Sequence, residues 1–466
     1  MAAPGKRSRD MTQGTIWKHL VAFALPLMLG NLFQQLYNTV DSIVVGRYVS
    51  TQALAAVGST SSIINMLVGF FMGLSVGAGV IISQRFGAKD DEGVHKAVHT
   101  TVAMTLILGA AFTAIGIFLT PYMLRLMKTP GDVFPEATAY LQIYFGGVSG
   151  LMLYNMGSGI LRAVGDSRRP LYFLVFSSVT NIILDLLFVL GLGMGVEGVA
   201  YATIASQLLS AGLILVVLSR ACEAYRFRPR ALRVYPDVLR SVVRVGLPAG
   251  LQQALTSFSN VFVQGYINAF GSACMAGWGC YHRLDQFLLL PMQSISMGST
   301  TFMGQNIGAR NLKRAEKGVH TAIGLSLAVT AVLTVLLNIF CQPLIRIFNE
   351  NPAVVAYGSM FVRMISPFYL VVCFNQIYAG ALRGAGDAKA PMVMMLFSFV
   401  LFRQIYLFVG TQFINTEWFV GLGYPAGWVV CSILQMAYFY KSRWRDRCRA
   451  AWSAEDAARE LKKASA

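Results

Sequence analysis

The sequence predicts an all-α integral membrane protein, with twelve transmembrane helices in two six-helix bundles related by a pseudo-two-fold axis along the membrane normal. The composition is the first reason, because 55% of the 466 residues are hydrophobic and only 13% are charged, which differs from ordinary soluble domains. Apolar runs long enough to cross a bilayer are the second reason. Repetition of three segments between the two halves is the third.

Twelve apolar runs follow one another with short connections, and each can span a hydrocarbon core roughly 30 Å thick as a helix. The polar start of the chain leads directly into the first run. It lacks the short apolar stretch and small-residue cleavage site of a signal peptide, so we expect the first helix to remain in the mature protein. In order, the expected spans cover residues 17–43, 52–82, 97–124, 136–161, 170–192, 196–219, 242–269, 275–305, 319–344, 354–381, 390–410 and 423–440.

Three segments of the first half recur in the second half in the same order. "SQRFGAKD" at position 83 matches "GQNIGARN" at position 304, and "LRAVGDSRRP" at position 161 matches "LRGAGDAKAP" at position 382, with the same offset. Pro26 and Pro248 correspond at almost the same offset. Six spans per half make the repeats parallel, as in one class of transporter, so we expect a substrate path between two rocking bundles.

Basic residues indicate the orientation. With the N-terminus in the cytoplasm, 31 of the 38 Lys and Arg lie in the tails and the cytoplasmic connections or, as Lys18 and Arg244 do, at the cytoplasmic end of a span; four lie in the outer connections and three lie deeper inside spans. Both termini are therefore expected in the cytoplasm. The expected parts are a tail (1–16), an N-lobe of six helices (17–220), a basic linker (221–241), a C-lobe of six helices (242–440) and a second tail (441–466).

Three acidic residues fall within the spans, namely Asp41, Asp185 and Asp285. A charge at bilayer depth is costly, so such residues usually face a cavity or a partner. Gln34 and Tyr37 precede Asp41 at spacings that place all three on one helical face.

On the fifth span, Asn181 precedes Asp185 by four residues and shares its face. Thr203 on the sixth span and Asn155 on the fourth add oxygen-bearing groups in the same half, and no internal cation is evident on these spans. Two carboxylates without a counter-charge indicate a mobile partner, either Na⁺ held by oxygen ligands or a proton. The alternative is that each Asp hydrogen-bonds between helices.

The repeat makes this cluster asymmetric. When the two halves are aligned on the repeated segments, Asp41 falls opposite Val263, Asp185 opposite Tyr406 and Asn181 opposite Phe402. A pair of carboxylates with a purely architectural role would be expected in both copies.

The second half carries a polar stripe along its first span, which includes Gln253 and Asn260. It lines the translocation path or joins helices by hydrogen bonds. For Asp285 we expect a buried ion pair with one of three internal arginines, and contact with substrate is the alternative. Those arginines are Arg283, Arg363 and Arg403.

Several classes of function are not supported. The chain has no phosphate-binding Gly-Lys loop, no arrangement for covalent catalysis and no soluble basic domain, so we expect neither an enzyme nor a nucleic-acid-binding protein. Seven cysteines and five histidines lack the spacing of metal ligands. No cofactor is expected apart from the coupling ion.

The opening "LPLMLGNLFQQLYNTVDSIVVGRYVSTQALAAVG", the two repeated connections and "TFMGQNIGARN" resemble the multidrug and toxic compound extrusion (MATE) family over about residues 14–442. The resemblance implies a Na⁺- or H⁺-driven antiporter that exports organic, often cationic, amphipathic compounds by alternating access. It also implies an N-lobe cation site at Asp41, Asn181, Asp185 and Thr203, with Gln34, Tyr37 and Asn155 lining the same cavity.

The resemblance has one departure. A second cation site that one branch places in the C-lobe has Thr256 and about Val372 at its positions here, which favours coupling in the N-lobe alone, although "RLDQ" around Asp285 resembles another branch. We therefore expect a monomeric, multi-pass efflux transporter of the bacterial inner membrane, in contact with lipid and with a drug or toxin as substrate. The alternative is a flippase of a lipid or lipid-linked oligosaccharide.

Overall fold

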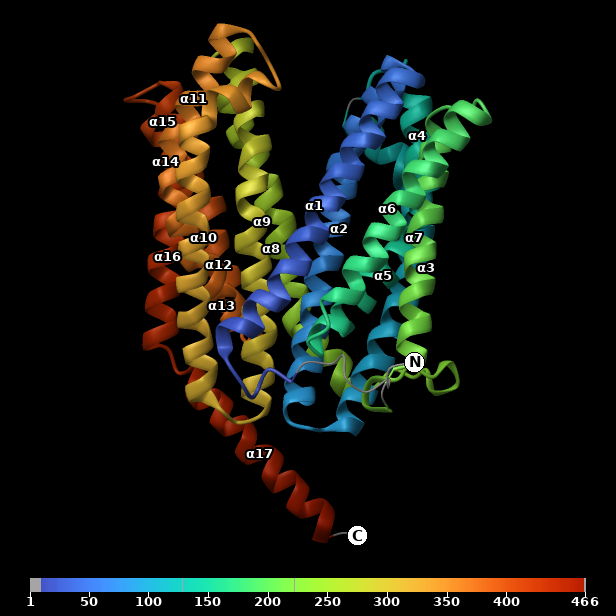
Figure 1. The fold of residues 1–466 in the computed structure, drawn as a ribbon, viewed down its shortest axis with the longest axis vertical. Coiled ribbons are helices and arrows are strands. Elements are labelled where there is room, and N and C mark those ends of the chain that lie inside the picture. Colours follow the sequence, from blue (N-terminus) through green and yellow to red (C-terminus); the bar gives the residue numbers. More distant parts are fainter. Residues whose placement is uncertain (1–9, 128, 222, 465–466) are drawn as a thin grey trace. The chain divides into compact units, whose positions relative to one another are not determined.

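A computed structural model of the chain describes residues 10–127, 129–221 and 223–464, and all regular secondary structure in these residues is helical (Figure 1). The described residues form two compact units. The first unit contains residues 26–86 and 90–250, and the second contains residues 10–25, 87–89 and 251 onwards.

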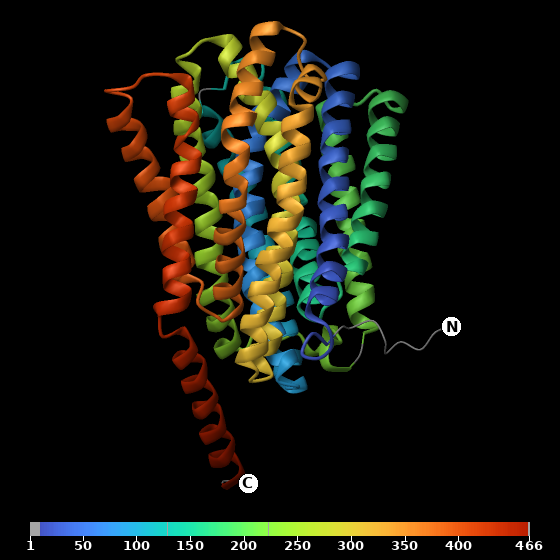
Figure 2. The ribbon, with the colours of Figure 1, turned by 60° about the vertical axis from the view of Figure 1, so that its left-hand side comes forward.

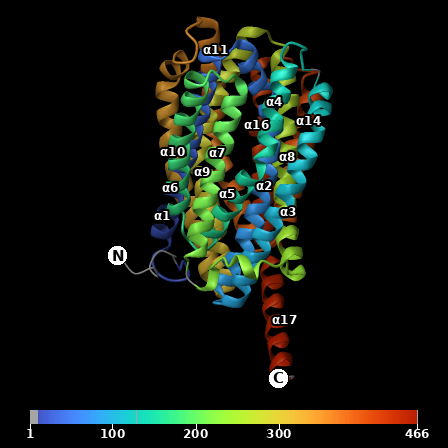
Figure 3. The ribbon, with the colours of Figure 1, turned by 90° about the vertical axis from the view of Figure 1, so that its right-hand side faces the viewer.

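The first unit is a helical bundle in which α3 packs against α4 and α5, while α7 packs against α4, α5 and α6 (Figure 3). Its elements are most of α1 (Ile16–Tyr48), α2 (Thr51–Gly87), α3 (Asp91–Leu126), α4 (Phe134–Gly146), α5 (Val148–Ala163), α6 (Arg168–Leu186), the π-helical turn η1 (Leu187–Gly191), α7 (Val196–Ser219), the 3₁₀ turns η2 (Glu223–Tyr225) and η3 (Pro229–Ala231), and the first half of α8 (Pro236–Asn268).

In the second unit, α9 contacts α10, α11 and α12, and α16 packs against α12 (Figure 2). Its further elements are α9 (Ser272–Gly308), α10 (Leu312–Arg346), α11 (Pro352–Ile365), the 3₁₀ turn η4 (Ser366–Phe368), α12 (Tyr369–Gly384), α13 (Lys389–Leu396), the π-helical turn η5 (Phe397–Phe402), α14 (Arg403–Gly410), α15 (Glu417–Gly421), α16 (Gly423–Lys441) and α17 (Trp444–Ala464).

All twelve predicted spans correspond to helical segments. Within the described part of the chain, nine of these segments are long and apolar enough to cross a membrane. The other three are α8 and α9, which are 33 and 37 residues long but carry many polar side chains, and the pair α4–α5. This pair is interrupted at Gly147, where a Cβ atom would overlap the Ile204 side chain of α7. The prediction of twelve helices in two bundles is confirmed.

Glycines bring α2 and α8 into backbone contact within the first unit. A Cβ atom on Gly73 would overlap the backbone nitrogen of Gly250, and one on Gly77 would lie 2.5 Å from the backbone of Gly246. Each helix carries its two glycines four residues apart, which is the small-residue spacing that lets helices approach closely in membranes. We call this contact the four-glycine crossing.

Residues 444–464 form a helix, α17, that continues from α16 (Figure 2), although the sequence was expected to give only a cytoplasmic tail there. Trp444 is 1% exposed and anchors the start of α17. Two ion pairs hold the first turn to the second unit, one between Arg445 and Glu316 and one of 2.6 Å between Arg447 and Asp387. Helical spacing alone did not reveal α17 because its stability depends on these distant partners.

Candidate cation site and buried charges

Two carboxyl groups meet inside the first unit, one from α1 and one from α6. Asp41 and Asp185 lie within hydrogen-bonding reach of each other. Asp185 is fully buried, and Asn181 on the preceding turn of α6 is 2% exposed. Sequence periodicity placed Asn181 and Asp185 on one face, whereas the meeting of α1 with α6 is a result of the fold.

Apart from the contact between the two carboxyls, five buried polar atoms of this cluster have no hydrogen-bond partner among the described residues. They are Oδ1 of Asp41, both carboxyl oxygens of Asp185, and Oδ1 and Nδ2 of Asn181. Buried polar groups in proteins are nearly always hydrogen-bonded, and an unpartnered one costs about 1–3 kcal/mol. The cluster therefore has unsatisfied polar atoms beyond the contact that joins α1 to α6.

Two tyrosines lie beside the carboxyl pair, and two more lie beside these tyrosines. The Tyr37 hydroxyl hydrogen-bonds with Gln34 and lies near Asp41, Tyr144 and Tyr154. Tyr140 lies near both carboxyls and stacks on Tyr144, with ring centroids 6.5 Å apart. Tyr37 thus lies beside Asp41 and bonds to Gln34, while a role for either in lining a cavity stays a prediction. Sequence reasoning missed the tyrosines of α4 and α5, although Tyr140 and Tyr144 share a helical face and gave a usable signal.

The remaining polar residues predicted for this half bond within their own helices. Thr203 donates to the Val199 carbonyl at 3.0 Å, and Asn155 donates to the Leu151 carbonyl at 2.9 Å. The structure thus brings Asp41 and Asp185 together beside Asn181, while Thr203 and Asn155 make no hydrogen bond to that pair among the described residues.

The expectation that the first half has no internal cation is wrong. α5 extends to Ala163 and therefore includes Arg162, which the sequence analysis placed in a connection. Arg162 is half-buried, lies near Tyr154 and donates to the Ser75 hydroxyl at 3.5 Å. Within the described ranges it forms no ion pair with Asp41 or Asp185, so the two carboxyls still lack a fixed counter-charge there.

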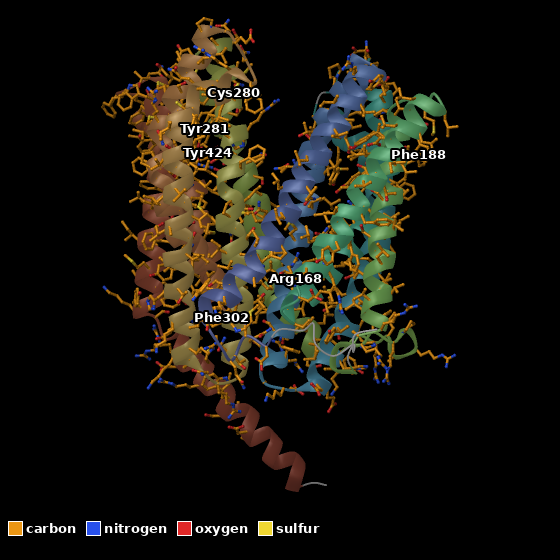
Figure 4. All side chains as sticks on the ribbon, in the orientation of Figure 1. Arg168, Phe188, Cys280, Tyr281, Phe302 and Tyr424 are labelled. Atoms are coloured by element: carbon orange, nitrogen blue, oxygen red, sulfur yellow. The ribbon has the colours of Figure 1, made fainter. Side chains whose placement is uncertain are left out.

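Asp285 in the second unit does not form the expected ion pair with an arginine of the described chain. The Tyr369 hydroxyl donates to Asp285 Oδ1, and the His282 Nδ1 atom lies 3.5 Å from Asp285 Oδ2. Tyr281 extends this chain through a hydroxyl contact of 3.2 Å with Tyr369. Tyr424 lies near Tyr281 in the same unit (Figure 4). Tyrosines can satisfy a buried carboxylate at lower desolvation cost than an arginine.

Arg403 instead bonds to neutral groups on α8. Its Nη2 atom donates to Ser259 Oγ at 2.7 Å and to Asn260 Oδ1 at 2.8 Å. Asn260 thus lies on an internal face, whereas Gln253 is exposed. The buried glutamine of α8 is its neighbour Gln252, which donates to Met395 Sδ.

Metal sites of the transition-metal type are not found in the described residues. No group of three or more His, Cys, Asp or Glu side chains converges there, and none of the six described cysteines forms a disulfide. The side-chain polar atoms of Asp41, Asp185 and Asn181 are all oxygens apart from the amide nitrogen of Asn181. Oxygen donors suit hard cations such as Na⁺.

A multi-pass helical membrane protein with two parallel repeats and polar groups buried within each half has the design of a solute transporter. The chain belongs to the MatE family, whose model matches residues 26–187 and again residues 248–409. The family model thus matches each half once, which confirms the internal repeat and the resemblance to MATE proteins.

Relatives of known name cover nearly the whole chain. It is 32% identical over 443 residues to the "Probable multidrug resistance protein YpnP" of Bacillus subtilis (strain 168), covering 94% of this chain and 98% of that protein. It is 24% identical to an "FAD transporter" of Shewanella oneidensis, covering 85% of this chain and 88% of that protein.

The fold also matches solved structures. A multidrug resistance MATE transporter in an outward-facing conformation aligns with a TM-score of 0.88 at 24% identity, covering 96% of this chain and 99% of that chain. At this identity the likeness shows the fold alone.

Proposed function

We propose that this protein is a secondary active exporter that exchanges Na⁺ or H⁺ for amphipathic small molecules, with coupling at the Asp41–Asp185 pair. The observation that carries the proposal is the facing pair of carboxyls with its unpartnered buried oxygens in the described chain. Cation binding favours one conformation and substrate binding favours the other, which is how two ligands of one transporter can be exchanged.

The carboxyl pair needs a positive partner because two carboxylates at this separation repel each other when both are ionised. A proton shared between Asp41 and Asp185 removes the repulsion. A sodium ion does the same when held by their oxygens, with the Asn181 carbonyl and the Thr203 hydroxyl as further oxygen donors after a change of rotamer. The oxygen ligands fit both ions, so we propose coupling to either Na⁺ or H⁺.

The tyrosines around the pair support a small-molecule substrate. The rings of Tyr37, Tyr140, Tyr144 and Tyr154 offer apolar faces, which bind aromatic compounds and organic cations. Names of relatives point to drugs in one case and to a flavin dinucleotide in another. We infer a substrate of this size class, carried outward across the bacterial inner membrane by a monomer with both termini in the cytoplasm.

The test is transport by the purified protein in proteoliposomes, with a Na⁺ gradient and a pH gradient imposed separately. One of the gradients should drive uptake of a fluorescent drug into inside-out vesicles, and dissipating it should stop uptake. Transport at the same rate without either gradient would contradict coupling. Movement of a fluorescent lipid in place of the drug would favour the flippase alternative.

A further inference from the structure

A buried cation lies in the second unit beside neutral groups. Arg403, the first residue of α14, is 2% exposed. Its guanidinium carbon lies 4.5 Å from the centroid of the Tyr424 ring, and in the described chain its hydrogen bonds run to the neutral side chains of Ser259 and Asn260. All of these groups belong to the second unit.

The charge of Arg403 is not balanced by contact. In the described residues no carboxylate lies within ion-pair distance of its guanidinium. Asp285 lies near the same Tyr424 ring, but its oxygens face Tyr369 and His282. An intramembrane cation of this kind is rare, and it usually marks a path for ligands or ions.

The guanidinium has unused capacity for hydrogen bonds. It carries five N–H groups, and the two bonds to Ser259 and Asn260 both start from Nη2. The Nε atom is buried and has no partner in the part of the chain that the structure describes. Because both N–H groups of Nη2 are used, the N–H of Nε is left to donate one charge-assisted hydrogen bond to a carboxylate or phosphate.

The repeat relates Arg403 to the cation cluster of the first unit. The π-helical turn η5 ends at Phe402, and a π turn holds one residue more than an α turn. Leu161 aligns with Leu382, which is an offset of 221 residues between the halves. The two family matches end at positions 187 and 409, which is an offset of 222 residues. The second half therefore has one residue more than the first between these two points. After η5 the equivalent of Asn181 is therefore Arg403, where the uncorrected offset gave Phe402.

The two halves thus differ in charge: the first carries the two carboxyls of α1 and α6, and the second carries a buried arginine at the position equivalent to the neutral Asn181. In the first unit Asn181 stands beside two carboxyls, and no described arginine bonds to them. In the second unit Arg403 stands beside Ser259 and Asn260, and the position opposite Asp41 is Val263. A purely structural arginine would need no such difference in charge, because neutral side chains can join α8 and α14 equally well.

We propose that Arg403 binds an anionic group of the transported substrate, so that the preferred substrates are amphipathic anions or zwitterions that carry a carboxylate or phosphate. The anion accepts a hydrogen bond from Nε, and the Tyr424 ring stays against the face of the guanidinium. The proposal rests on the proposed transport function and names its substrate class.

The test uses two dyes that differ at one group. Rhodamine 6G is an ethyl ester with a net positive charge, and rhodamine 19 is its free acid. Binding of each to the purified full-length protein is followed by fluorescence anisotropy without any gradient. The wild type should bind the free acid about tenfold more tightly than the ester, since one charge-assisted bond distinguishes them.

Three variants decide the outcome. Arg403→Gln should remove the preference, and Arg403→Lys should retain part of it. Asn260→Asp places a carboxylate beside the guanidinium, so this variant should also remove the preference for the free acid. The new ion pair keeps the fold intact, so the variant tests the proposal even where Arg403→Gln fails to fold. Arg283→Gln is the matched control, because Arg283 is exposed on α9 and should leave the preference unchanged.

Equal binding of the two dyes by the wild type, or an unchanged preference in Asn260→Asp, would overturn the proposal. The coupling proposal is tested separately by gradient-driven transport of Asp41→Asn, whereas anion binding is tested without any gradient in the Arg403 and Asn260 variants. Loss of gradient-driven transport and loss of the dye preference are therefore distinguished by separate measurements.

Discussion

The carboxyl of Asp185 on α6 lies within hydrogen-bonding reach of the carboxyl of Asp41 on α1, and apart from this contact Oδ1 of Asp41 and both oxygens of Asp185 have no partner among the described residues. In the proposed function the two groups act on one cation or one proton, so removing either should have the same consequence as removing both. This relationship gives the first prediction.

Asp41→Asn and Asp185→Asn should each abolish cation-driven efflux, and the double variant should be no worse than either single one. Efflux of a fluorescent drug from proteoliposomes measures this, with membrane insertion checked by the yield of folded protein. Asp132→Asn is the control, because Asp132 is exposed outside the helical spans. Efflux at the wild-type rate by Asp41→Asn or Asp185→Asn would contradict the proposed coupling site.

The four-glycine crossing should tolerate no side chain. Gly77→Ala puts a Cβ atom 2.5 Å from the Gly246 backbone, so α2 and α8 must move apart. Overpacking of this kind costs about 1–3 kcal/mol, which should appear as a lower thermal midpoint of the purified protein. Gly212→Ala is the control, because a Cβ atom on Gly212 meets nothing within 4 Å. Equal midpoints for the two variants would show that the helices do not touch there.

The hydroxyl of Tyr369 satisfies the buried Asp285 carboxyl, so Tyr369→Phe should destabilise the second unit by about 1–3 kcal/mol, the usual cost of an unpartnered buried acceptor. Thermal unfolding monitored by intrinsic fluorescence provides the measurement. Tyr281→Phe should cost less, since its hydroxyl contacts that of Tyr369 at 3.2 Å rather than the carboxyl. The reverse order would mean that Asp285 relies on Tyr281.

Trp444 fixes the start of α17 through burial of its ring and a hydrogen bond of 2.8 Å from its Nε1 to the Phe439 carbonyl. Trp444→Ala should destabilise this attachment by about 3–5 kcal/mol, as for other buried aromatic residues. Limited proteolysis should then cleave within α17 while the rest of the chain stays intact. Trp17→Ala, at a tryptophan that is 52% exposed, should leave α17 protected.

Cys448 reports the same attachment through its reactivity. Burial raises the pKa of the Cys448 thiol to about 11, so at pH 8 only about one molecule in a thousand carries the reactive thiolate. In a variant that keeps Cys448 as its only cysteine, maleimide labelling should be slow at pH 8 and accelerate as the pH rises. Trp444→Ala in that background should speed labelling at pH 8, because the thiol returns toward its ordinary pKa of about 8.5. Fast labelling without the substitution would show that α17 is not packed.

Much of the fold could be predicted because each membrane-spanning helix must satisfy its own backbone hydrogen bonds and therefore leaves an apolar run in the sequence. The same reasoning located Asp41 and Asp185, since a carboxylate stands out against lipid-facing side chains. It did not locate Arg162, because a basic residue at the end of a run looks like part of a connection. It also paired Asp285 with an arginine, because a sequence does not show that Tyr369 is closer.

By itself the sequence determined the twelve helices, the two repeats and the acidic residues of one half, because each of these is a matter of spacing and composition along one helix. The tertiary structure decided which side chains from different helices meet. It placed Asp41 beside Asp185, Tyr369 beside Asp285 and Arg403 beside Asn260. Such contacts depend on how helices pack, which a periodic pattern on one helix does not specify.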